Sequence, residues 1–293
     1  MQTYQKYISK AAVLIEALPY IQQFRGALVV VKFGGSAMED ATCAESALRD
    51  IVLMECVGMK PVVVHGGGKA ISARLKELNI ETRFVNGLRY TCEESIKVVD
   101  DVLHNQINRQ LVQSIEKFGG QAVGLSGKDV IGAIPMNATD EAGEPADLGF
   151  VGEVDTVNVD PILAVTDRNE VPVITPLGTG ADGAIFNINA DLSACRIAEA
   201  LAARKLVFLS DVPGILADSQ DESSLIKTVC LSDVDRLIED RTITGGMVPK
   251  IRSAVDALQA GTNKVHLVDG RIQHSLLLEI FTDEGVGTQI VKT

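Results

Sequence analysis

The sequence predicts an α/β protein, a three-layer αβα sandwich with a mostly parallel central sheet and an additional helix at the N-terminus. Apolar runs of strand length alternate with helical patterns through most of the 293 residues. These runs are continuous in valine and isoleucine and do not alternate with polar residues. Such runs indicate strands that are buried on both faces and covered by helices.

The individual elements follow from these two patterns. Buried strands are expected at residues 28–33, 61–65, 122–125, 171–175, 205–210 and 264–268. Helices are expected between them at residues 41–59, 69–78, 93–118, 160–169, 191–203, 234–241 and 249–260.

Two segments break this alternation. Residues 130–155 contain turn dipeptides between short alternating runs and predict a hairpin that leaves the main sheet. Residues 178–183 match the glycine-rich dinucleotide fingerprint, but they lead into a strand-like run and open no helix, so we predict a second hairpin at 178–187. A boundary near residues 183–187 divides the chain into an N-terminal lobe, 27–185, and a C-terminal lobe, 186–293. No low-complexity linker separates them, so one continuous sheet is expected.

Residues 1–26 precede the first strand and predict an amphipathic helix. Its apolar residues at helical spacing are Ile8, Ala11, Ala12, Ile15 and Leu18. Pro19 should kink or restart the helix. The periodicity alone fits a helix packed on its own domain as well as an arm that contacts another subunit.

Composition excludes several classes of protein. A formal net charge of -12 provides no basic field for nucleic acid or an anionic membrane. The five cysteines are scattered and the four histidines form no metal-ligand pattern, which favours reduced thiols and no protein metal site. No signal peptide or membrane span is evident near the N-terminus, so a cytoplasmic protein is expected.

Glycines that follow two buried strands are the strongest chemical signal. Lys32-Phe33-Gly34-Gly35 ends the first strand, and His65-Gly66-Gly67-Gly68 ends the second and precedes a helix. Glycines without Cβ atoms let a phosphate approach backbone N–H groups, and Lys32 is a candidate phosphate clamp. A surface lysine beside a turn is the alternative for this segment taken alone. Two such loops in one chain suggest two glycine nests facing one anion.

Further polar residues are individually weak signals. Asp191 ends Asn187-Ile188-Asn189-Ala190-Asp191, a run that ordinary N-capping also explains. Lys250 follows Gly245-Gly246 at the start of a helix. Arg89 follows the turn Asn86-Gly87 and suits bidentate capture of a carboxylate, although a solvated arginine is the simpler explanation. No P-loop motif is present, because Gly68-Lys69-Ala70 lacks both the spacing and the hydroxyl.

In order along the chain, six motifs resemble those of the amino-acid kinase family, and within it the acetylglutamate kinases. They are Lys32-Phe33-Gly34-Gly35, His65-Gly66-Gly67-Gly68, Asn86-Gly87-Leu88-Arg89, Asn187-Ile188-Asn189-Ala190-Asp191, Leu209-Ser210-Asp211-Val212-Pro213-Gly214 and Gly245-Gly246-Met247-Val248-Pro249-Lys250. The resemblance implies an open αβα sandwich that holds N-acetylglutamate in the N-terminal lobe and ATP with Mg²⁺ in the C-terminal lobe. It also implies phosphorylation of the γ-carboxylate in arginine biosynthesis.

The same resemblance implies a role for each matching residue. Lys32 and Lys250 would stabilise the phosphoryl group in transfer, and Asp191 would orient both lysines. The phosphate path and nucleotide would be bound by Gly34, Gly35, Asp211, Gly245, Gly246 and Met247, and N-acetylglutamate by Gly66, Gly67, Arg89 and Asn187. The chemistry agrees, because phosphoryl transfer needs positioning and charge neutralisation, and an ionised carboxylate attacks without a general base.

Two further segments look like those of the arginine-inhibited members. They are Glu16-Ala17-Leu18-Pro19-Tyr20-Ile21 and the terminal Leu278-Glu279-Ile280-Phe281 with Gly285-Val286-Gly287-Thr288. By this resemblance Tyr20, Glu279 and Gly287 would line an allosteric arginine site. The chain would form a homo-oligomer, a dimer or a hexameric trimer of dimers linked by the N-terminal helices.

Several alternatives stay open at the level of sequence. A sibling kinase that uses N-acetyl-aminoadipate, carrier-linked glutamate or carbamate would carry similar motifs. A regulatory amino-acid-sensing module would lack Lys32, Asp191 or Lys250, and a purely structural scaffold would not bind ATP. Lys128 is either a second cation for the acceptor or a solvated lysine. The sequence leaves open whether a PII signalling protein binds.

Overall fold

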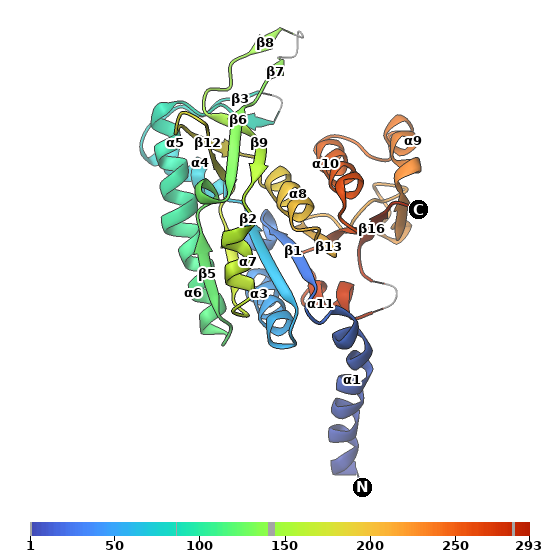
Figure 1. Cartoon of the computed structure of the whole chain (residues 1–293). Helices are drawn as coiled ribbons and strands as arrows, with labels where there is room; N and C mark the ends of the chain where they lie inside the picture. Colours follow the sequence, from blue (N-terminus) through green and yellow to red (C-terminus); the bar gives the residue numbers. More distant parts are fainter. Residues whose placement is uncertain (1, 86, 140–143, 283–284) are drawn as a thin grey trace.

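The protein is described by a computed structural model that covers residues 2–85, 87–139, 144–282 and 285–293. Within these residues one eight-stranded sheet forms the centre of the molecule (Figure 1). In spatial order its strands are β14 (Thr228–Cys230), β16 (Thr288–Val291), β15 (Val265–Asp269), β13 (Lys205–Ser210), β1 (Leu28–Phe33), β2 (Lys60–His65), β10 (Val171–Ile174) and β5 (Ala122–Leu125). The pairing is parallel except between β15 and β16, which confirms the predicted mostly parallel sheet.

Helices cover both faces of the sheet. In chain order they are α1 (Gln2–Phe24), α2 (Ser36–Glu39), α3 (Ala41–Cys56), α4 (Gly68–Glu77), α5 (Glu93–Asp100), the π-helical segment η1 (Asp101–Asn108), α6 (Arg109–Lys117), α7 (Asp160–Thr166), α8 (Ala190–Ala200), α9 (Val234–Glu239), α10 (Met247–Ala260) and α11 (Ser275–Ile280). Short 3₁₀ turns lie at η2 (Gly127–Asp129), η3 (Glu222–Ser224) and η4 (Leu231–Asp233).

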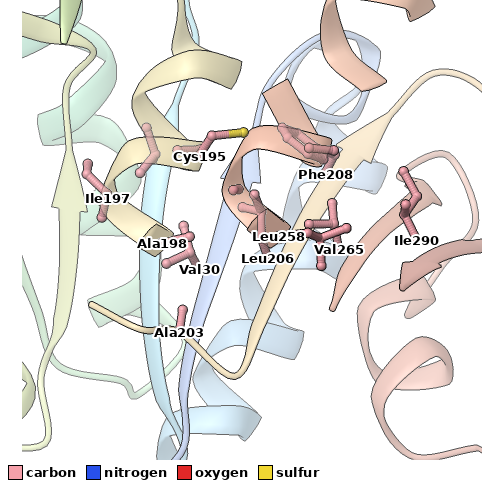
Figure 2. Packing of buried hydrophobic residues seen from close by; sticks show 14 of the residues in the cluster. Val30, Cys195, Ile197, Ala198, Ala203, Leu206, Phe208, Leu258, Val265 and Ile290 are labelled. Atoms are coloured by element: carbon pink, nitrogen blue, oxygen red, sulfur yellow. The ribbon is translucent and has the colours of Figure 1, made fainter. Parts of the chain in front are cut away.

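Alternate residues of each buried strand enter two separate cores. In β1, Val30 packs into the core beneath α8 and α10, whereas Val29 and Val31 pack into the core beneath α3 and α6. Figure 2 shows the first core, in which Val30, Leu206 and Phe208 lie against side chains of α8 and α10. Because successive strand side chains point to opposite faces, a valine run with no polar interruption is what two covered faces require.

Both predicted hairpins leave the main sheet and form a small closed barrel. Its strands are β6 (Ile131–Pro135), β9 (Val151–Val157), β11 (Leu177–Thr179) and β12 (Ile185–Ile188). The glycine-rich segment 178–183 lies in the tight turn between β11 and β12, where the Gly180 N–H donates to the Ala184 carbonyl. Two short ribbons complete the fold: β3 (Phe84–Val85) with β4 (Leu88–Arg89), and β7 (Ala138–Thr139) with β8 (Pro145–Ala146). Residues 140–143, between β7 and β8, lie outside the described residues.

Several elements differ from the sequence predictions. The helix expected at 93–118 contains the π-helical segment η1, which its helical periodicity does not indicate. The strands β14 and β16 and the helix α11 were not predicted, because each is too short to show a clear period. The helices expected to start at 191 and 249 begin at Ala190 and Met247.

The N-terminal helix differs from one expectation as well. α1 continues through Pro19 as one helix, so of the expected kink or restart the restart does not occur. Its large apolar side chains from Tyr4 to Leu18 are exposed, and contact with the rest of the chain begins near Tyr20 and Phe24. In Figure 1 the helix projects away from the sheet. A helix packed along its own domain is therefore excluded for residues 4–18.

Candidate active site at the carboxyl ends of the parallel strands

The two glycine loops lie in contact at the carboxyl ends of β1 and β2. The Gly66 N–H donates to the Phe33 carbonyl over 2.8 Å, which joins the second loop to the first strand. A Cβ atom added to Gly34 would lie 3.6 Å from the Gly66 nitrogen and 3.0 Å from Lys32 Nζ. Glycine at position 34 therefore leaves the ammonium group and the backbone of the second loop close together, as expected at the ligand-binding edge of a parallel sheet.

Three charged side chains from separate parts of the chain meet beside these loops. Asp191 Oδ1 lies 2.9 Å from Nζ of Lys32, on β1, and Asp191 Oδ2 lies 2.5 Å from Nζ of Lys250, on α10. Burial by itself would raise the pKa of Asp191, but the two ammonium groups outweigh it and hold the pKa below its usual value. An ionised carboxylate thus holds two lysines a short distance apart, with their remaining N–H groups available to an anion.

Local sequence fixes the position of Asp191. The Asn189 side chain caps α8 by accepting hydrogen bonds from the N–H groups of Asp191 and Leu192. Asp191 therefore lies in the first helical turn. Lys250 lies in the first turn of α10, and its Nζ is 4.9 Å from the centre of the Phe208 ring. The two helix starts converge, which brings together charges that are 59 residues apart in the chain.

A cavity of about 810 Å³ opens next to this cluster. Its lining includes seven of the predicted site residues: Lys32, Gly35, Gly66, Gly67, Arg89, Asn187 and Asp191. The structure thus gathers the predicted phosphate-binding and acceptor-binding residues around one space. Its volume lies within the usual range for small-molecule sites.

Arg89 also lines this cavity, and part of its guanidinium is unsatisfied. Its Nη2 donates to the Gly68 carbonyl at 2.9 Å and to Ser72 Oγ at 2.6 Å. Its Nη1 is buried, and no group among the described residues accepts a hydrogen bond from it. Burial lowers the pKa of Arg89, although a guanidinium stays charged at neutral pH. A buried donor without a partner is costly, and Arg89 lines the cavity, so a ligand carboxylate bound there would supply the missing acceptor.

Sequence reasoning did not identify the two groups that orient Arg89. Ser72 lies four residues after Gly68 on α4, so both face the same side of the helix. That spacing was the signal available, but only the fold shows that the Arg89 side chain reaches this face. Asn86, part of the same motif, lies outside the described residues.

Asn187 and Lys128 have different surroundings from each other. Asn187 lines the cavity from β12, and its Nδ2 donates to Thr91 Oγ1 at 3.3 Å. Lys128 forms an ion pair with Asp100 at 2.8 Å and does not line the cavity. The suggestion that Lys128 provides a second cation for the acceptor is therefore not supported by its position.

Asp211 and residues 245–247, which are predicted to bind the nucleotide, do not line this cavity. Asp211 directly follows β13, the neighbour of β1, and its side chain is exposed. Gly245 and Gly246 are exposed just before α10, and Gly245 has a φ of +54°, which glycine adopts without strain. Met247 begins α10, the helix that carries Lys250. These residues border the cluster from the C-terminal part of the sheet.

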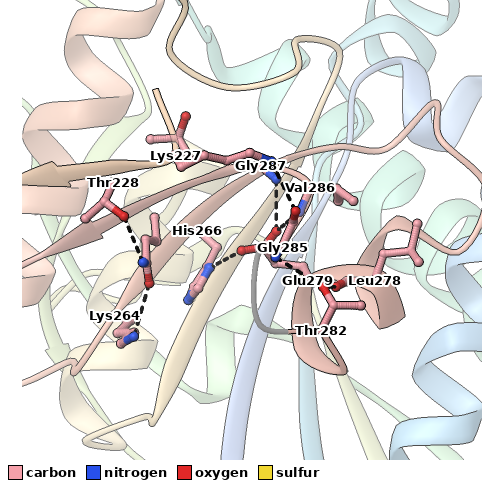
Figure 3. A network of polar contacts seen from close by, with 12 residues as sticks. Lys227, Thr228, Lys264, His266, Leu278, Glu279, Thr282, Gly285, Val286 and Gly287 are labelled. Atoms are coloured by element: carbon pink, nitrogen blue, oxygen red, sulfur yellow. Dashed lines mark hydrogen bonds and ion pairs between the residues drawn. The ribbon is translucent and has the colours of Figure 1, made fainter. Parts of the chain in front are cut away.

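A second cavity, of about 340 Å³, brings together Tyr20, Glu279 and Gly287. Tyr20 of α1 makes an edge-to-face contact with Phe281, with ring centres 6.5 Å apart. Glu279 Oε2 accepts hydrogen bonds from the N–H groups of Val286 and Gly287, and its Oε1 lies 2.5 Å from Nδ1 of His266 (Figure 3). The second cavity therefore joins the end of the N-terminal helix to the C-terminal segment.

The charges around this second cavity are mixed. Burial lowers the pKa of His266, while the pKa of Glu279 is also lowered, because hydrogen bonds from His266 and two backbone N–H groups outweigh its burial. Both shifts agree with a neutral imidazole that donates to an ionised carboxylate. Lys205 also lines the cavity, and burial lowers its pKa to about 8.

Three negative observations concern the described part of the chain. It contains no group of three or more His, Cys, Asp and Glu side chains arranged to hold a metal ion, and its five cysteines are unpaired. None of its helices combines the length and apolar character needed to cross a membrane.

Comparisons with known proteins agree with this architecture. A model of the amino acid kinase family matches residues 27–269. The acetylglutamate kinase of Carboxydothermus hydrogenoformans is 48% identical over 291 residues, which cover 98% of this chain and 99% of that protein. The one from Akkermansia muciniphila is 46% identical over 291 residues, with 98% and 97% covered.

Solved structures also share this architecture. The N-acetylglutamate synthase of Neisseria gonorrhoeae, complexed with coenzyme A and N-acetyl-glutamate, is 26% identical with a TM-score of 0.84, and the match covers 97% of this chain but only 63% of that longer chain. Carbamate kinase from Giardia lamblia bound to AMP-PNP shares the fold at 18% identity, with a TM-score of 0.67 and coverage of 92% and 99%.

Proposed function

The chain belongs to the amino acid kinase family, and on this premise we propose that it transfers the γ-phosphoryl group of ATP to the γ-carboxylate of N-acetyl-L-glutamate. The observation that carries the proposal is the pair of lysines held by Asp191 at two glycine loops, beside a cavity that is also lined by an arginine with an unsatisfied nitrogen. The relatives named acetylglutamate kinase, at 46–48% identity over nearly the full length, support this choice of acceptor.

The residues supply positioning and charge. Arg89 Nη1 and Asn187 bind polar groups of N-acetylglutamate and direct its γ-carboxylate towards the glycine loops. That carboxylate is ionised at neutral pH and attacks the phosphorus without a general base. Lys32 and Lys250 neutralise charge on the transferring phosphoryl oxygens, while Asp191 sets the spacing of the two lysines.

The backbone contributes the remaining donors. Gly34, Gly35, Gly66 and Gly67 allow N–H groups to approach the phosphate oxygens, and Asp211 with residues 245–247 borders the nucleotide. ATP is proposed to bind together with Mg²⁺. When bound, Mg²⁺ neutralises part of the phosphate charge.

The proposal also covers the division into lobes, the assembly of subunits and the metabolic role. Residues 27–185 form the lobe that binds the acyl-amino acid and residues 186–293 the lobe that binds ATP. The exposed apolar side chains of α1 support a role for residues 1–26 as an arm between subunits of a homo-oligomer, a dimer or a trimer of dimers. The enzyme then works in arginine biosynthesis in the cytoplasm.

L-Arginine is proposed as a feedback inhibitor that binds the second cavity. Tyr20, Glu279 and Gly287 line that cavity, where Glu279 offers an ionised carboxylate to a guanidinium and Lys205 a cation to a carboxylate. The synthase from N. gonorrhoeae, solved in complex with L-arginine, matches 97% of this chain and 65% of its own length at 26% identity, with a TM-score of 0.80.

One assay tests both levels of the proposal. ADP release is measured with magnesium-ATP and N-acetylglutamate, glutamate or N-acetyl-aminoadipate, each with and without L-arginine. Turnover restricted to N-acetylglutamate and suppressed by arginine is expected. Turnover of a different acceptor in place of N-acetylglutamate, or no turnover with any of the three acceptors, contradicts the proposed reaction. Turnover of N-acetylglutamate that arginine does not change contradicts the regulatory site.

A further inference from the structure

A buried polar pair lies directly beneath the second glycine loop. His65, the last residue of β2, is fully buried, and Asn108, the last residue of η1, is 2% exposed. Asn108 Nδ2 lies 2.7 Å from the Val173 carbonyl oxygen and 3.3 Å from His65 Nε2. His65 Nδ1 lies 2.9 Å from the Gly66 carbonyl oxygen. The proposed reaction uses neither side chain.

The chemistry of each group determines which atom donates and which accepts in these three contacts. The Val173 carbonyl only accepts, so the atom of Asn108 facing it is the amide nitrogen, which has a second hydrogen to donate to His65 Nε2. Nε2 must then be unprotonated, and the proton of a neutral imidazole lies on Nδ1, which donates to the Gly66 carbonyl. Burial lowers the pKa of His65 to about 4, so the imidazole is neutral at pH 7.

A hydrogen bond that fixes the orientation of the Gly66 carbonyl also fixes the orientation of the Gly67 N–H. A trans peptide is planar, and its N–H points opposite to its C=O. The described chain has no cis peptide bonds. The Gly67 N–H therefore points away from His65, and it makes no hydrogen bond to any described residue. Gly67 lines the 810 Å³ cavity beside Lys32 and Asp191.

The same helical segment supports Gly67 by packing. A Cβ atom added to Gly67 would lie 2.7 Å from Leu103 Cδ2 and 2.7 Å from Ile107 Cδ1, both on η1. The loop therefore has a polar contact through His65 and an apolar contact through these two side chains. π-Helical segments occur frequently at functional sites, and here one presents three buried residues to a single loop.

We propose that His65, whose ring is oriented by Asn108, is a positioning residue that holds the Gly66–Gly67 peptide with its N–H directed at the transferring phosphoryl group. This role rests on the proposed function. A donor fixed in advance stabilises charge that develops during transfer, so its loss should lower kcat more than it raises KM.

Kinetics of matched variants provide the first test. His65→Phe removes both ring nitrogens, whereas His65→Asn places an amide nitrogen near the position of Nδ1 and retains a donor for Gly66. Ile115→Ala, in the buried part of α6, controls for loss of stability without touching the loop. We expect kcat to fall by about tenfold or more in His65→Phe, with KM for N-acetylglutamate within about threefold of wild type. His65→Asn and Ile115→Ala should keep kcat within about threefold.

Other kinetic results would contradict either the positioning role or the proposed function. An equal loss of kcat in His65→Phe and His65→Asn, or no greater loss than in Ile115→Ala, overturns the positioning role. Wild-type protein that turns over no N-acetylglutamate contradicts the proposed function instead, and the spectroscopic test then decides the positioning role.

That second test needs no turnover. Imidazole ¹⁵N NMR of the wild-type protein at pH 7 should show His65 protonated at Nδ1 and unprotonated at Nε2, and Asn108→Ala should disturb this tautomer. An Nε2-protonated ring or an imidazolium at pH 7 overturns the proposal, as does an unchanged tautomer in Asn108→Ala.

Discussion

Lys250 Nζ lies 2.5 Å from Asp191 Oδ2, so a helix start in the last fifth of the chain is tied to the helix start that faces the glycine loops. Asp191 is the only carboxylate that the described residues place in contact with both Lys32 and Lys250. Its charge keeps two ammonium groups close together. The site therefore depends on one side chain for the separation of its cations.

Replacement of Asp191 should disrupt this arrangement. In Asp191→Asn the two lysines lose their shared counter-charge and move apart, and kcat should fall about 10²- to 10³-fold, as when a transition-state donor is lost. Steady-state kinetics measure the change. Asp167→Asn, which removes an exposed ion pair with Lys60, is the control and should leave kcat unchanged. Comparable activity of Asp191→Asn and wild type would exclude the assigned role.

Arg89 should act mainly in acceptor binding. Arg89→Lys retains a positive charge but lacks the fork that contacts Gly68, Ser72 and the ligand together. We expect KM for N-acetylglutamate to rise by about 10- to 100-fold, because the charge-assisted contact assigned to Nη1 is lost. KM for ATP should change little. A rise in KM for ATP alone would place Arg89 on the nucleotide side and contradict the assignment.

The two adjacent glycines Gly67 and Gly68 provide a matched pair. Alanine at 67 would press against Leu103 and Ile107, so Gly67→Ala should lower the free energy of unfolding by about 1–3 kcal/mol and reduce kcat. A Cβ at position 68 meets no atom within 4 Å and lies in the first turn of α4. Gly68→Ala should therefore be neutral or stabilising by up to about 1 kcal/mol. Urea unfolding of both variants tests this, and equal destabilisation would show that the close packing is not specific to Gly67.

The buried histidine makes stability depend on pH. His65 has a pKa of about 4 in the folded protein and 6.5 as its ordinary value, so between these values the unfolded chain binds a proton that the folded chain does not. The contribution of neutral His65 to the free energy of unfolding is fully present above pH 6.5 and is lost as the pH falls towards 4. By pH 5 the free energy of unfolding has fallen by about 2 kcal/mol. His266, whose pKa is also lowered, acts in the same direction.

Urea unfolding at pH 7.5 and pH 5 measures this effect. The loss of stability on acidification should be smaller by about 2 kcal/mol in His65→Phe than in the wild-type protein. Cys56→Ser, at an exposed position, serves as the control and should retain the wild-type difference. An identical loss in His65→Phe and wild type would mean that His65 titrates normally in the folded state.

The sequence alone determined the class of fold and the main strands. Valine and isoleucine runs without polar interruption required two covered faces, and β1, β2, β5, β10, β13 and β15 were all found near their expected positions. It also indicated the glycine loops, Lys32 and Asp191, because a glycine-rich strand end and a capped helix start have local sequence signals. These features depend on neighbours within a few residues, which a sequence displays directly.

Tertiary structure decided everything that joins distant segments. The meeting of Lys32, Asp191 and Lys250 depends on how α8 and α10 pack on the sheet. The surroundings of Arg89 depend on its side chain reaching α4, and the contact between Asn108 and His65 depends on a π-helical segment that the helical periodicity of residues 93–118 does not reveal. Packing and hydrogen bonding between segments separated by tens of residues select these contacts, and no periodicity within one segment carries that information.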